Sequence, residues 1–315
     1  MCPRNYRGLD HNSGYPQCEL TLANMQSIVT PQLLFQMATC RDPFRQSGVN
    51  FNGNLGDFAS ARDAKEIALW LAQESVPVYI NTNGSVRNAA WWAALAHAKI
   101  QVGFAIDGLE DTHSLYRQDT DWHKIIAHAQ ALISAGGRAV WRFILFDHNR
   151  HQLEACRTLA QQLGFERFEV INDGRNQTPV YTRSGEFSHW IGPEQPHVPD
   201  SAAMLHSHVT WFRVETVRHP QDTPSAKISC QHQQQGEIYI AADGTVWPCC
   251  FLGFYPGQMQ HPGNEQLLPL VHENNALEHD LAHCLDWFEQ VEATWAHNSV
   301  QTGRLYQCVS NCARS

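Results

Sequence analysis

The sequence predicts an α/β protein with a parallel-sheet domain and a small C-terminal α+β domain rich in cysteine. Short apolar strands alternate with helices over residues 1–172, and strands separated by helices form parallel sheets. Polar side chains follow most of these strands, and five cysteines gather around a predicted hairpin near the C-terminal end. The 315 residues suffice for one barrel-sized domain and one smaller domain.

Hydrophobic periodicity places the elements of the first domain. The predicted strands cover residues 49–51, 76–81, 100–106, 138–146 and 168–171. The predicted helices cover residues 20–37, 61–73, 89–97, 122–134 and 151–163. Gly164 follows the last helix, where glycine is typical of a helix C-cap.

Polar residues lie directly after the strands, where parallel sheets assemble their binding sites. They are Asn52, Thr82, Asn83, Asp107, His148 and Asn149. A lone Asn or Asp at such a position is more often a turn former. Because several strands end in this way, we expect a ligand site at this edge of the sheet.

Residues 173–228 are predicted to be a linker region, because prolines are scattered there among polar residues. The region contains one strand-like run, 208–215, and leads into the cysteine-rich domain, residues 229–315.

The last domain is organised around a hairpin of residues 236–240 and 245–247, with 242–244 as its turn. Cys230 precedes this hairpin, Cys249 follows it, and Cys308 and Cys312 arrive from the C-terminal tail. Four thiolates suit either zinc or an iron–sulfur cluster, and the pattern alone does not distinguish them. Two further cysteines are expected outside the group: Cys250, which points away from Cys249, and Cys284, inside a helix predicted near 276–295.

Composition excludes some classes of partner. The formal net charge is −9, and no run of basic residues could follow a phosphate backbone, so nucleic acid is not expected. No segment is long and apolar enough to predict a membrane span, and the N-terminus carries no secretion signal. We therefore expect a cytoplasmic protein with reduced thiols and a small-molecule or peptide substrate.

The strand-end motifs also carry a family resemblance. The order Asn52-Gly53-Asn54, Thr82-Asn83-Gly84 and AIDG at 105–108, with His113 and Arg117 beyond it, resembles the barrel of radical S-adenosylmethionine enzymes. A second motif lies in the last domain, where thirteen residues separate Cys230 from Gly244 and four separate Gly244 from Cys249. This spacing is similar to the opening of the twitch and SPASM auxiliary-cluster domains. The resemblance implies a partial (β/α)6 TIM-like barrel lacking its first strand, followed by an auxiliary iron–sulfur domain.

The chain departs from this family at its beginning. The family holds a catalytic [4Fe-4S] cluster with a CxxxCxxC loop, and only Cys2 matches it, as the third cysteine. The expectation is a chain truncated within that motif. The other interpretation is a naturally degenerate member.

The resemblance also implies a chemistry. S-adenosylmethionine would be cleaved reductively to a 5'-deoxyadenosyl radical, which abstracts a hydrogen atom from the substrate, with flavodoxin or ferredoxin as electron donor. The implied cofactor-binding residues are Asn52, Gly53 and Asn54 for the methionine amino group, Arg117 for its carboxylate, Asp107 for the ribose, His148 and Asn149 for adenine or substrate, with Thr82 and Asn83. The implied metal ligands are Cys2 for the catalytic cluster, if the missing cysteines are restored, and Cys230, Cys249, Cys308 and Cys312 for an auxiliary [4Fe-4S] cluster.

Two other classes remain open. A zinc-dependent barrel hydrolase would use Asp107, His113, Asp147 or His148, although these residues form no compact ligand motif. A non-catalytic binding module would combine a decayed barrel with a structural metal site.

Overall fold

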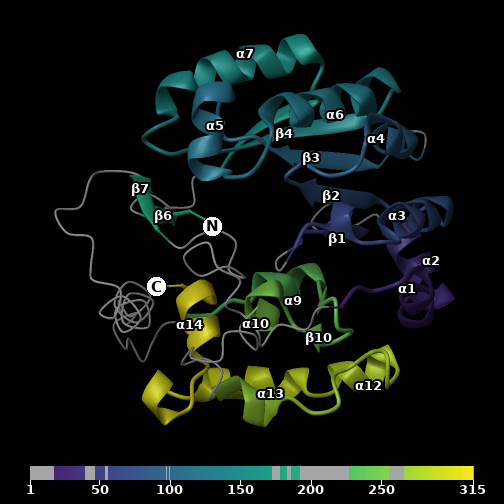
Figure 1. The fold of residues 1–315 in the computed structure, drawn as a ribbon. Coiled ribbons are helices and arrows are strands. Elements are labelled where there is room, and N and C mark those ends of the chain that lie inside the picture. The colour runs from purple at the N-terminus through teal and green to yellow at the C-terminus, as the bar shows by residue number, and fades with distance from the viewer. Residues whose placement is uncertain are drawn as a thin grey trace. The chain divides into compact units, whose positions relative to one another are not determined.

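The computed structural model forms two units, each described here by itself (Figure 1). The first contains residues 1–11, 21–42 and 47–196, and the second contains 12–20, 43–46 and 197–315. The structure describes residues 18–39, 47–53, 56–96, 98, 100–171, 178–182, 186–191, 227–254 and 266–314. Cys2, Asn54 and the strand-like run 208–215 lie outside the described residues.

The first unit is built on a five-stranded parallel sheet in the order β1-β2-β3-β4-β5. The strands are β1 Val49–Phe51, β2 Val78–Thr82, β3 Gln101–Ala105, β4 Arg138–Ile144 and β5 Arg167–Ile171. Each overlaps a strand predicted from sequence, so the parallel α/β architecture is confirmed. In the described part of the chain, β1 is an edge strand, paired with β2 alone.

Helices fill the connections between the strands (Figure 1). They are α3 Ala64–Gln73, α4 Ala89–Ala96, α5 Glu110–Tyr116, α6 Trp122–Ser134 and α7 Leu153–Leu163, with short 3-10 turns at Phe58–Ser60 and Arg150–Gln152. The predicted helix 122–134 is confirmed residue for residue. Gly164 caps α7 in the left-handed conformation, with φ of 85°, as predicted.

The two faces of the sheet differ in polarity because alternate side chains of a strand point to opposite faces. On the helix-covered face, Ile80, Phe104, Trp141 and Phe143 are buried. The other face carries half-buried polar residues such as Arg142. That second face and the strand ends are therefore where the sheet can offer polar groups to a ligand.

The first predicted helix is wrong in its extent. Residues 20–37 form two helices, α1 Leu22–Ile28 and α2 Pro31–Thr39. Pro31 explains the break, because proline starts a helix well but disfavours helical backbone at the residue before it.

The predicted linker contains a hairpin that sequence reasoning missed. Strands β6 Thr178–Tyr181 and β7 Phe187–Ile191 pair antiparallel within the first unit. Val180 and Ile191 are buried against Ile144 and Phe146 at the end of β4. This hairpin therefore extends the core of the first unit beyond the parallel sheet.

The second unit consists of short elements around a core that includes Trp247, Leu252, Leu267 and Trp287. Its strands are β8 Lys227–Ile228, β9 Tyr239–Ile240, β10 Val246–Trp247 and β11 Ala313–Arg314. Its helices are α9 Gln231–Gln235, α10 Cys250–Phe254, α12 Leu281–Leu285, α13 Phe288–Ala293 and α14 Tyr306–Cys312, with 3-10 turns at Leu268–Leu270, Thr294–Ala296 and Val300–Thr302.

The predicted hairpin of the second unit is confirmed, since β9 and β10 pair antiparallel and Gly244 adopts φ of 88° in the turn. The single helix predicted near 276–295 is wrong, because α12 and α13 are separate. Asp280 starts α12 as its N-cap, accepting a hydrogen bond from the His283 N–H. Among the described residues, no helix combines the length and apolar character that crossing a bilayer requires.

Candidate functional site

Four cysteines line one small pocket in the second unit. They are Cys230, Cys249, Cys308 and Cys312. The C-terminal tail therefore returns to the hairpin, as the sequence predicts, while the role of these cysteines as metal ligands stays a prediction. Cys250 and Cys284 do not line the pocket, also as predicted.

Each cysteine is positioned by a short element. Cys230 is the N-cap of α9, and its sulfur accepts the Gln233 N–H at 3.4 Å. Cys249 precedes α10, whose Leu252 and Phe251 N–H groups donate to its sulfur. Both sulfurs therefore face backbone donors, which favour the thiolate.

The C-terminal tail supplies the other two cysteines. Cys308 and Cys312 lie four residues apart on α14, and such residues share one face of a helix. Strand β11 then pairs with β8, and the Ser229 N–H donates to the Cys312 carbonyl at 3.0 Å. This pairing ties the tail to the chain next to Cys230.

Burial makes the two innermost thiols hard to ionise. Desolvation raises the pKa of Cys249 to about 12, and the nearby Cys308 thiol adds to the effect. Desolvation likewise raises the pKa of Cys308 to about 12, with contributions from Cys312 and Cys230. The two thiols are therefore neutral in the metal-free pocket, and their thiolates would need the positive charge of a metal centre beside them.

Buried N–H groups without full partners surround the same pocket. Gln307 lines the pocket and is 1% exposed, and its side-chain amide has no hydrogen-bond partner among the described residues. The Trp295 indole lies near enough to lower the pKa of Cys308, but its buried N–H completes no hydrogen bond within the described chain. Such orphaned donors suit a pocket that holds acceptor sulfur atoms.

The spacing of the sulfurs bears on the kind of metal centre. In the described structure the cysteine sulfurs form no set of three within 4.8 Å of one another. Tetrahedral zinc with Zn–S bonds of about 2.3 Å needs sulfurs roughly 3.8 Å apart. The four sulfurs are therefore not arranged as in a preformed tetrahedral zinc site.

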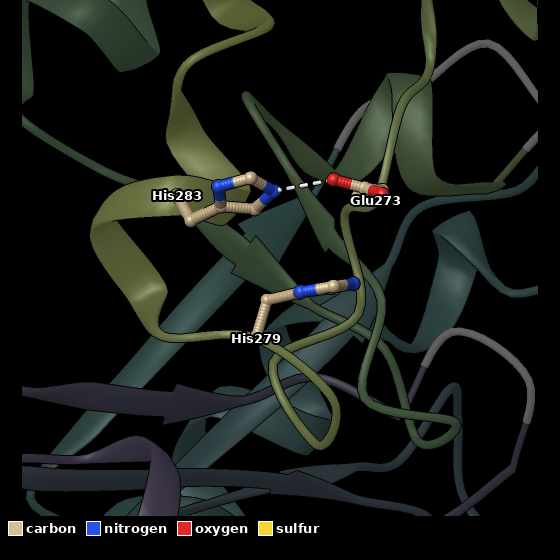
Figure 2. Close-up of side chains that lie close together, drawn as sticks. All are labelled: Glu273, His279 and His283. Atoms are coloured by element: carbon tan, nitrogen blue, oxygen red, sulfur yellow. Dashed lines mark hydrogen bonds and ion pairs between the residues drawn. The ribbon is translucent and has the colours of Figure 1, made fainter.

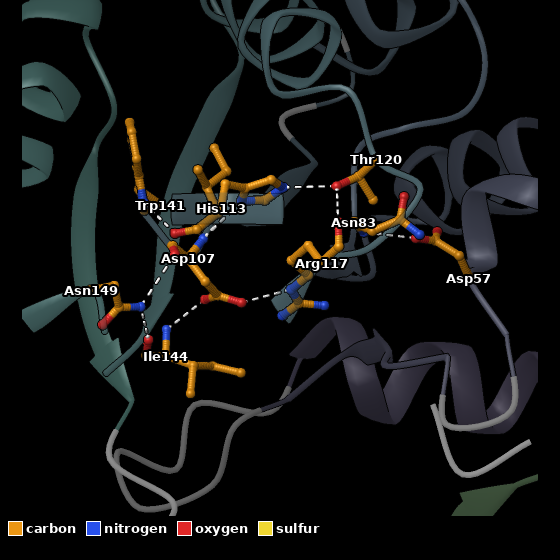
Figure 3. Close-up of polar contacts among 10 residues, drawn as sticks. Asp57, Asn83, Asp107, His113, Arg117, Thr120, Trp141, Ile144 and Asn149 are labelled. Carbon is orange, nitrogen blue, oxygen red and sulfur yellow. Dashed lines mark hydrogen bonds and ion pairs between the residues drawn. The ribbon is translucent and has the colours of Figure 1, made fainter. Parts of the chain in front are cut away.

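The first unit places Asp107 in a buried network at the end of β3 (Figure 3). Asp107 is fully buried, and one carboxylate oxygen accepts the Ile144 N–H at 2.7 Å. The other oxygen accepts the Arg117 Nε–H at 2.6 Å. Asp107 therefore joins the end of β3 to the end of β4 and to the C-terminal end of α5.

His113 supports the same network. Its Nδ1 accepts the Asp107 N–H at 3.1 Å, which leaves the proton of the neutral ring on Nε2, 3.0 Å from Thr120 Oγ1. Desolvation lowers the pKa of His113 to about 4, outweighing the opposite effect of Asp107. Both ring nitrogens are occupied, which disfavours His113 as a metal ligand. Asp107, His113, Asp147 and His148 form no convergent ligand set in the described structure.

Asn149 and His148 follow β4. The Asn149 amide donates to the Asp107 and Ile144 carbonyls and accepts the Phe146 N–H, so its side chain shapes this turn. His148 stacks on Phe146, and desolvation lowers its pKa. Their contact with adenine or substrate stays a prediction.

Asp57 is a site residue that sequence reasoning missed. Its carboxylate accepts hydrogen bonds from Thr82 Oγ1 at 2.9 and 3.0 Å. It also accepts the Asn83 N–H at 2.7 Å (Figure 3). The same carboxylate caps the 3-10 turn through the Ala59 N–H. The sequence could have indicated Asp57 as a helix cap, because an aspartate often precedes a short helical turn. It could not have indicated the contact with Thr82, which depends on the pairing of β1 with β2.

A polar row crosses the face of the sheet opposite the helices. The Asn81 amide donates to Asn52 Oδ1 at 2.5 Å, and its oxygen accepts from Arg142 at 2.6 Å. Gly103 makes room for this contact, because a Cβ there would lie 2.8 Å from both Arg142 Cδ and Asn81 Oδ1. Asn52 and Gly53, with φ of 59°, thus begin a row of polar groups that leads from β1 to β4.

No family model and no curated protein matches the chain. Solved structures give fold likenesses at low identity. A structure of anSMEcpe with bound AdoMet and Cp18Cys peptide has a TM-score of 0.47 and 13% identity, over 97% of this chain and 88% of that one. Streptococcus suis SuiB has a TM-score of 0.44 and 14% identity. SuiB bound to S-adenosylmethionine has a TM-score of 0.45.

The chain spans about half the length of SuiB, since the matches cover 73% of this chain and 54% or 52% of those chains. At these identities and TM-scores, the likenesses do not establish a family for this protein.

Proposed function

We propose that this protein belongs to the radical S-adenosylmethionine enzymes and that its second unit holds an auxiliary [4Fe-4S] cluster. The observation that carries the proposal is the meeting of four cysteines, two buried and two half-buried, around one pocket. Cys230, Cys249, Cys308 and Cys312 would be the ligands. When bound, such a cluster would supply a one-electron redox centre or would stabilise this small unit as a structural metal site does.

Two features of the chain's own residues agree with the proposed iron–sulfur cluster. The four sulfurs form no preformed tetrahedral zinc set, and the Gln307 amide is buried beside them without a partner among the described residues. Backbone donors at α9 and α10 would stabilise the thiolates of Cys230 and Cys249. The buried Cys308 thiol would lose its proton on binding.

S-adenosylmethionine would bind at the C-terminal ends of the parallel strands. Among the described residues, Asp107 engages only Nε of Arg117, which leaves the terminal amines of a planar guanidinium to pair with a carboxylate. Asp107 would act by orienting Arg117 in place of the ribose contact expected from sequence, because it is fully buried and its oxygens already accept two hydrogen bonds. The other residues proposed to bind the cofactor are Asn52, Gly53, Asn54, Thr82, Asn83, His148 and Asn149.

The proposed reaction is reductive cleavage of S-adenosylmethionine and hydrogen-atom abstraction from a small-molecule or peptide substrate. A flavodoxin or ferredoxin would be the electron donor. Structures of SuiB and of anSMEcpe hold S-adenosylmethionine. For the present chain we propose peptides as a substrate class and name no particular peptide.

Equilibrium binding of S-adenosylmethionine tests the proposed role of Arg117. The chain should bind it, and Arg117→Ala should weaken binding at least tenfold, since a charge-assisted hydrogen bond contributes about 1.5–3 kcal/mol. Arg117→Lys keeps a positive charge near Asp107 and separates loss of pairing from loss of folding. Arg157→Ala, an arginine on α7, is the control. Equal affinity of Arg117→Ala and Arg157→Ala would refute the assignment.

A further inference from the structure

A second group of metal-ligating side chains lies in the second unit, between β10 and the end of α12. Glu273, His279 and His283 each offer one ligand atom, and these atoms all lie within 4.8 Å of one another. Figure 2 shows the three side chains gathered, with Glu273 Oε2 lying 2.8 Å from His283 Nε2. The His279 and His283 ring centroids are 4.8 Å apart. None of the three lines the cysteine pocket.

The backbone that carries the two histidines is held by neighbouring hydrogen bonds. The His279 N–H donates to the Asn275 carbonyl at 3.0 Å, and the Asn275 side chain accepts the Leu277 N–H and donates to the Asp243 carbonyl. Asp280 caps the start of α12, which fixes His283 in its first turn. The histidines are therefore placed without help from an ion.

Glu273 is held in a backbone conformation that its residue type rarely adopts. Its φ is 45°, in the left-handed region that is strained for a non-glycine residue. Its carbonyl accepts the thiol of the buried Cys284 at 3.7 Å. The adjacent Asn274 is tied to Val246 through its carbonyl at 2.8 Å and its amide at 3.0 Å. These contacts on both sides hold the strained residue where its carboxylate meets the histidines.

We propose that Glu273, His279 and His283 form a binding site for a divalent transition-metal ion of the zinc class. Two imidazoles and one carboxylate are a ligand set typical of Zn²⁺, with water in the fourth position. Metal–ligand bonds of about 2.0–2.2 Å need ligand atoms roughly 3.3 Å apart. The ligand atoms lie within 4.8 Å of one another, so binding requires them to approach by at most about 1.5 Å.

Exposure and charge agree with an ion that enters from solvent. The Glu273 and His283 side chains are 64% and 43% exposed, so the ion keeps a path and a coordinated water. The exposed Glu278 and Asp280 add negative charge to the same segment. The site would clamp the loop before α12 onto α12 itself, while the cysteine pocket stays separate.

Titration of the full chain with Co²⁺, a spectroscopic substitute for Zn²⁺, tests the site. Cysteine-bound Co²⁺ gives sulfur-to-metal charge-transfer bands in addition to ligand-field bands, whereas an imidazole–carboxylate site gives ligand-field bands alone. The difference between the wild-type and His279→Ala spectra should therefore contain ligand-field bands without charge-transfer bands. Zn²⁺ should displace this component, and His279→Ala should bind the ion at least tenfold more weakly. His272→Ala removes an exposed neighbouring histidine outside the group and should bind as the wild type does.

Glu273→Gln separates binding from folding. The glutamine amide retains a hydrogen-bonding group for His283 but lacks the charge, so metal affinity should fall at least tenfold while the metal-free melting temperature stays unchanged. Added Zn²⁺ should raise the melting temperature of the wild type and not of His279→Ala. If the wild type, His279→Ala and Glu273→Gln bind Co²⁺ alike, or none shows the ligand-field component, the three residues form only a hydrogen-bonded cluster.

Discussion

Arg117 Nε lies 2.6 Å from Oδ2 of Asp107, a carboxylate with no exposed surface. Removing one member of a buried charge pair leaves the other uncompensated, which makes the pair a sensitive point of the first unit. The pair also fixes where the arginine at the end of α5 can present its remaining donors.

Asp107→Asn should therefore lower the free energy of unfolding by about 3–5 kcal/mol. The asparagine can still accept the Ile144 N–H but lacks the charge that Arg117 faces. Urea unfolding followed by tryptophan fluorescence measures the change. Glu166→Gln, which weakens the exposed pair with Arg138, is the control and should cost no more than about 1 kcal/mol. Equal effects of the two substitutions would contradict a buried charge pair at Asp107.

The His113 ring makes stability depend on pH. Its pKa is about 4 in the folded protein against 6.5 ordinarily, so between these values the unfolded chain binds the proton more readily. The free energy of unfolding should therefore be highest above pH 6.5 and decrease by up to about 3 kcal/mol as the pH falls to 4. Unfolding titrations between pH 7 and 4 should show this loss in the wild type and a smaller one in His113→Gln. Parallel pH profiles would show that His113 titrates normally.

Gly103 should tolerate no side chain. In Gly103→Ala the added Cβ would meet Arg142 Cδ and Asn81 Oδ1 at 2.8 Å, so the hydrogen bond between those residues must break or the sheet must shift. We expect a loss of about 1–3 kcal/mol in unfolding free energy, typical of overpacking. Gly56→Ala is matched to it, because nothing lies within 4 Å of that Cβ, and it should change stability by less than about 0.5 kcal/mol. A neutral Gly103→Ala would mean that the polar row is not fixed as described.

The strands and the meeting of the cysteines could be predicted from sequence because both follow local signals. Strand β3 appears as an apolar run before Asp107-Gly108, and Cys308 and Cys312 have helical spacing. Contacts that depend on register could not be predicted. Arg142 reaches Asn81 across β3 only because Asn81 pairs with Gly103, and Asp57 meets Thr82 through the placement of β1 beside β2.

The predicted helix boundaries were wrong where a helix-starting residue, Pro31 or Asp280, interrupted an apolar pattern. Periodicity alone joined α1 to α2 across Pro31, and it joined the segment before Asp280 to α12. The hairpin β6–β7 was missed because prolines and polar residues mask the few buried side chains, Val180 among them, that fix it.

Gln307 offers a test with opposite effects on two properties. In the cluster-free chain its buried, unpaired amide is a cost, so Gln307→Leu should raise the free energy of unfolding by about 1–3 kcal/mol. In the cluster-loaded chain the same substitution should lower the reduction potential, since N–H donors to sulfur favour the reduced, more negative cluster. Potentiometric titration followed by EPR measures the second effect. An unchanged potential would exclude a contact between this amide and the cluster.

The four-cysteine cluster is tested most directly by anaerobic reconstitution followed by iron and sulfide analysis and Mössbauer spectroscopy. The second unit should bind one cluster of four irons and four sulfides. Cys249→Ser and Cys308→Ser should each abolish or strongly reduce it, while Cys250→Ser and Cys18→Ser should leave it intact. Stoichiometric zinc without iron, or a cluster that survives loss of Cys249 and Cys308, would contradict the assignment.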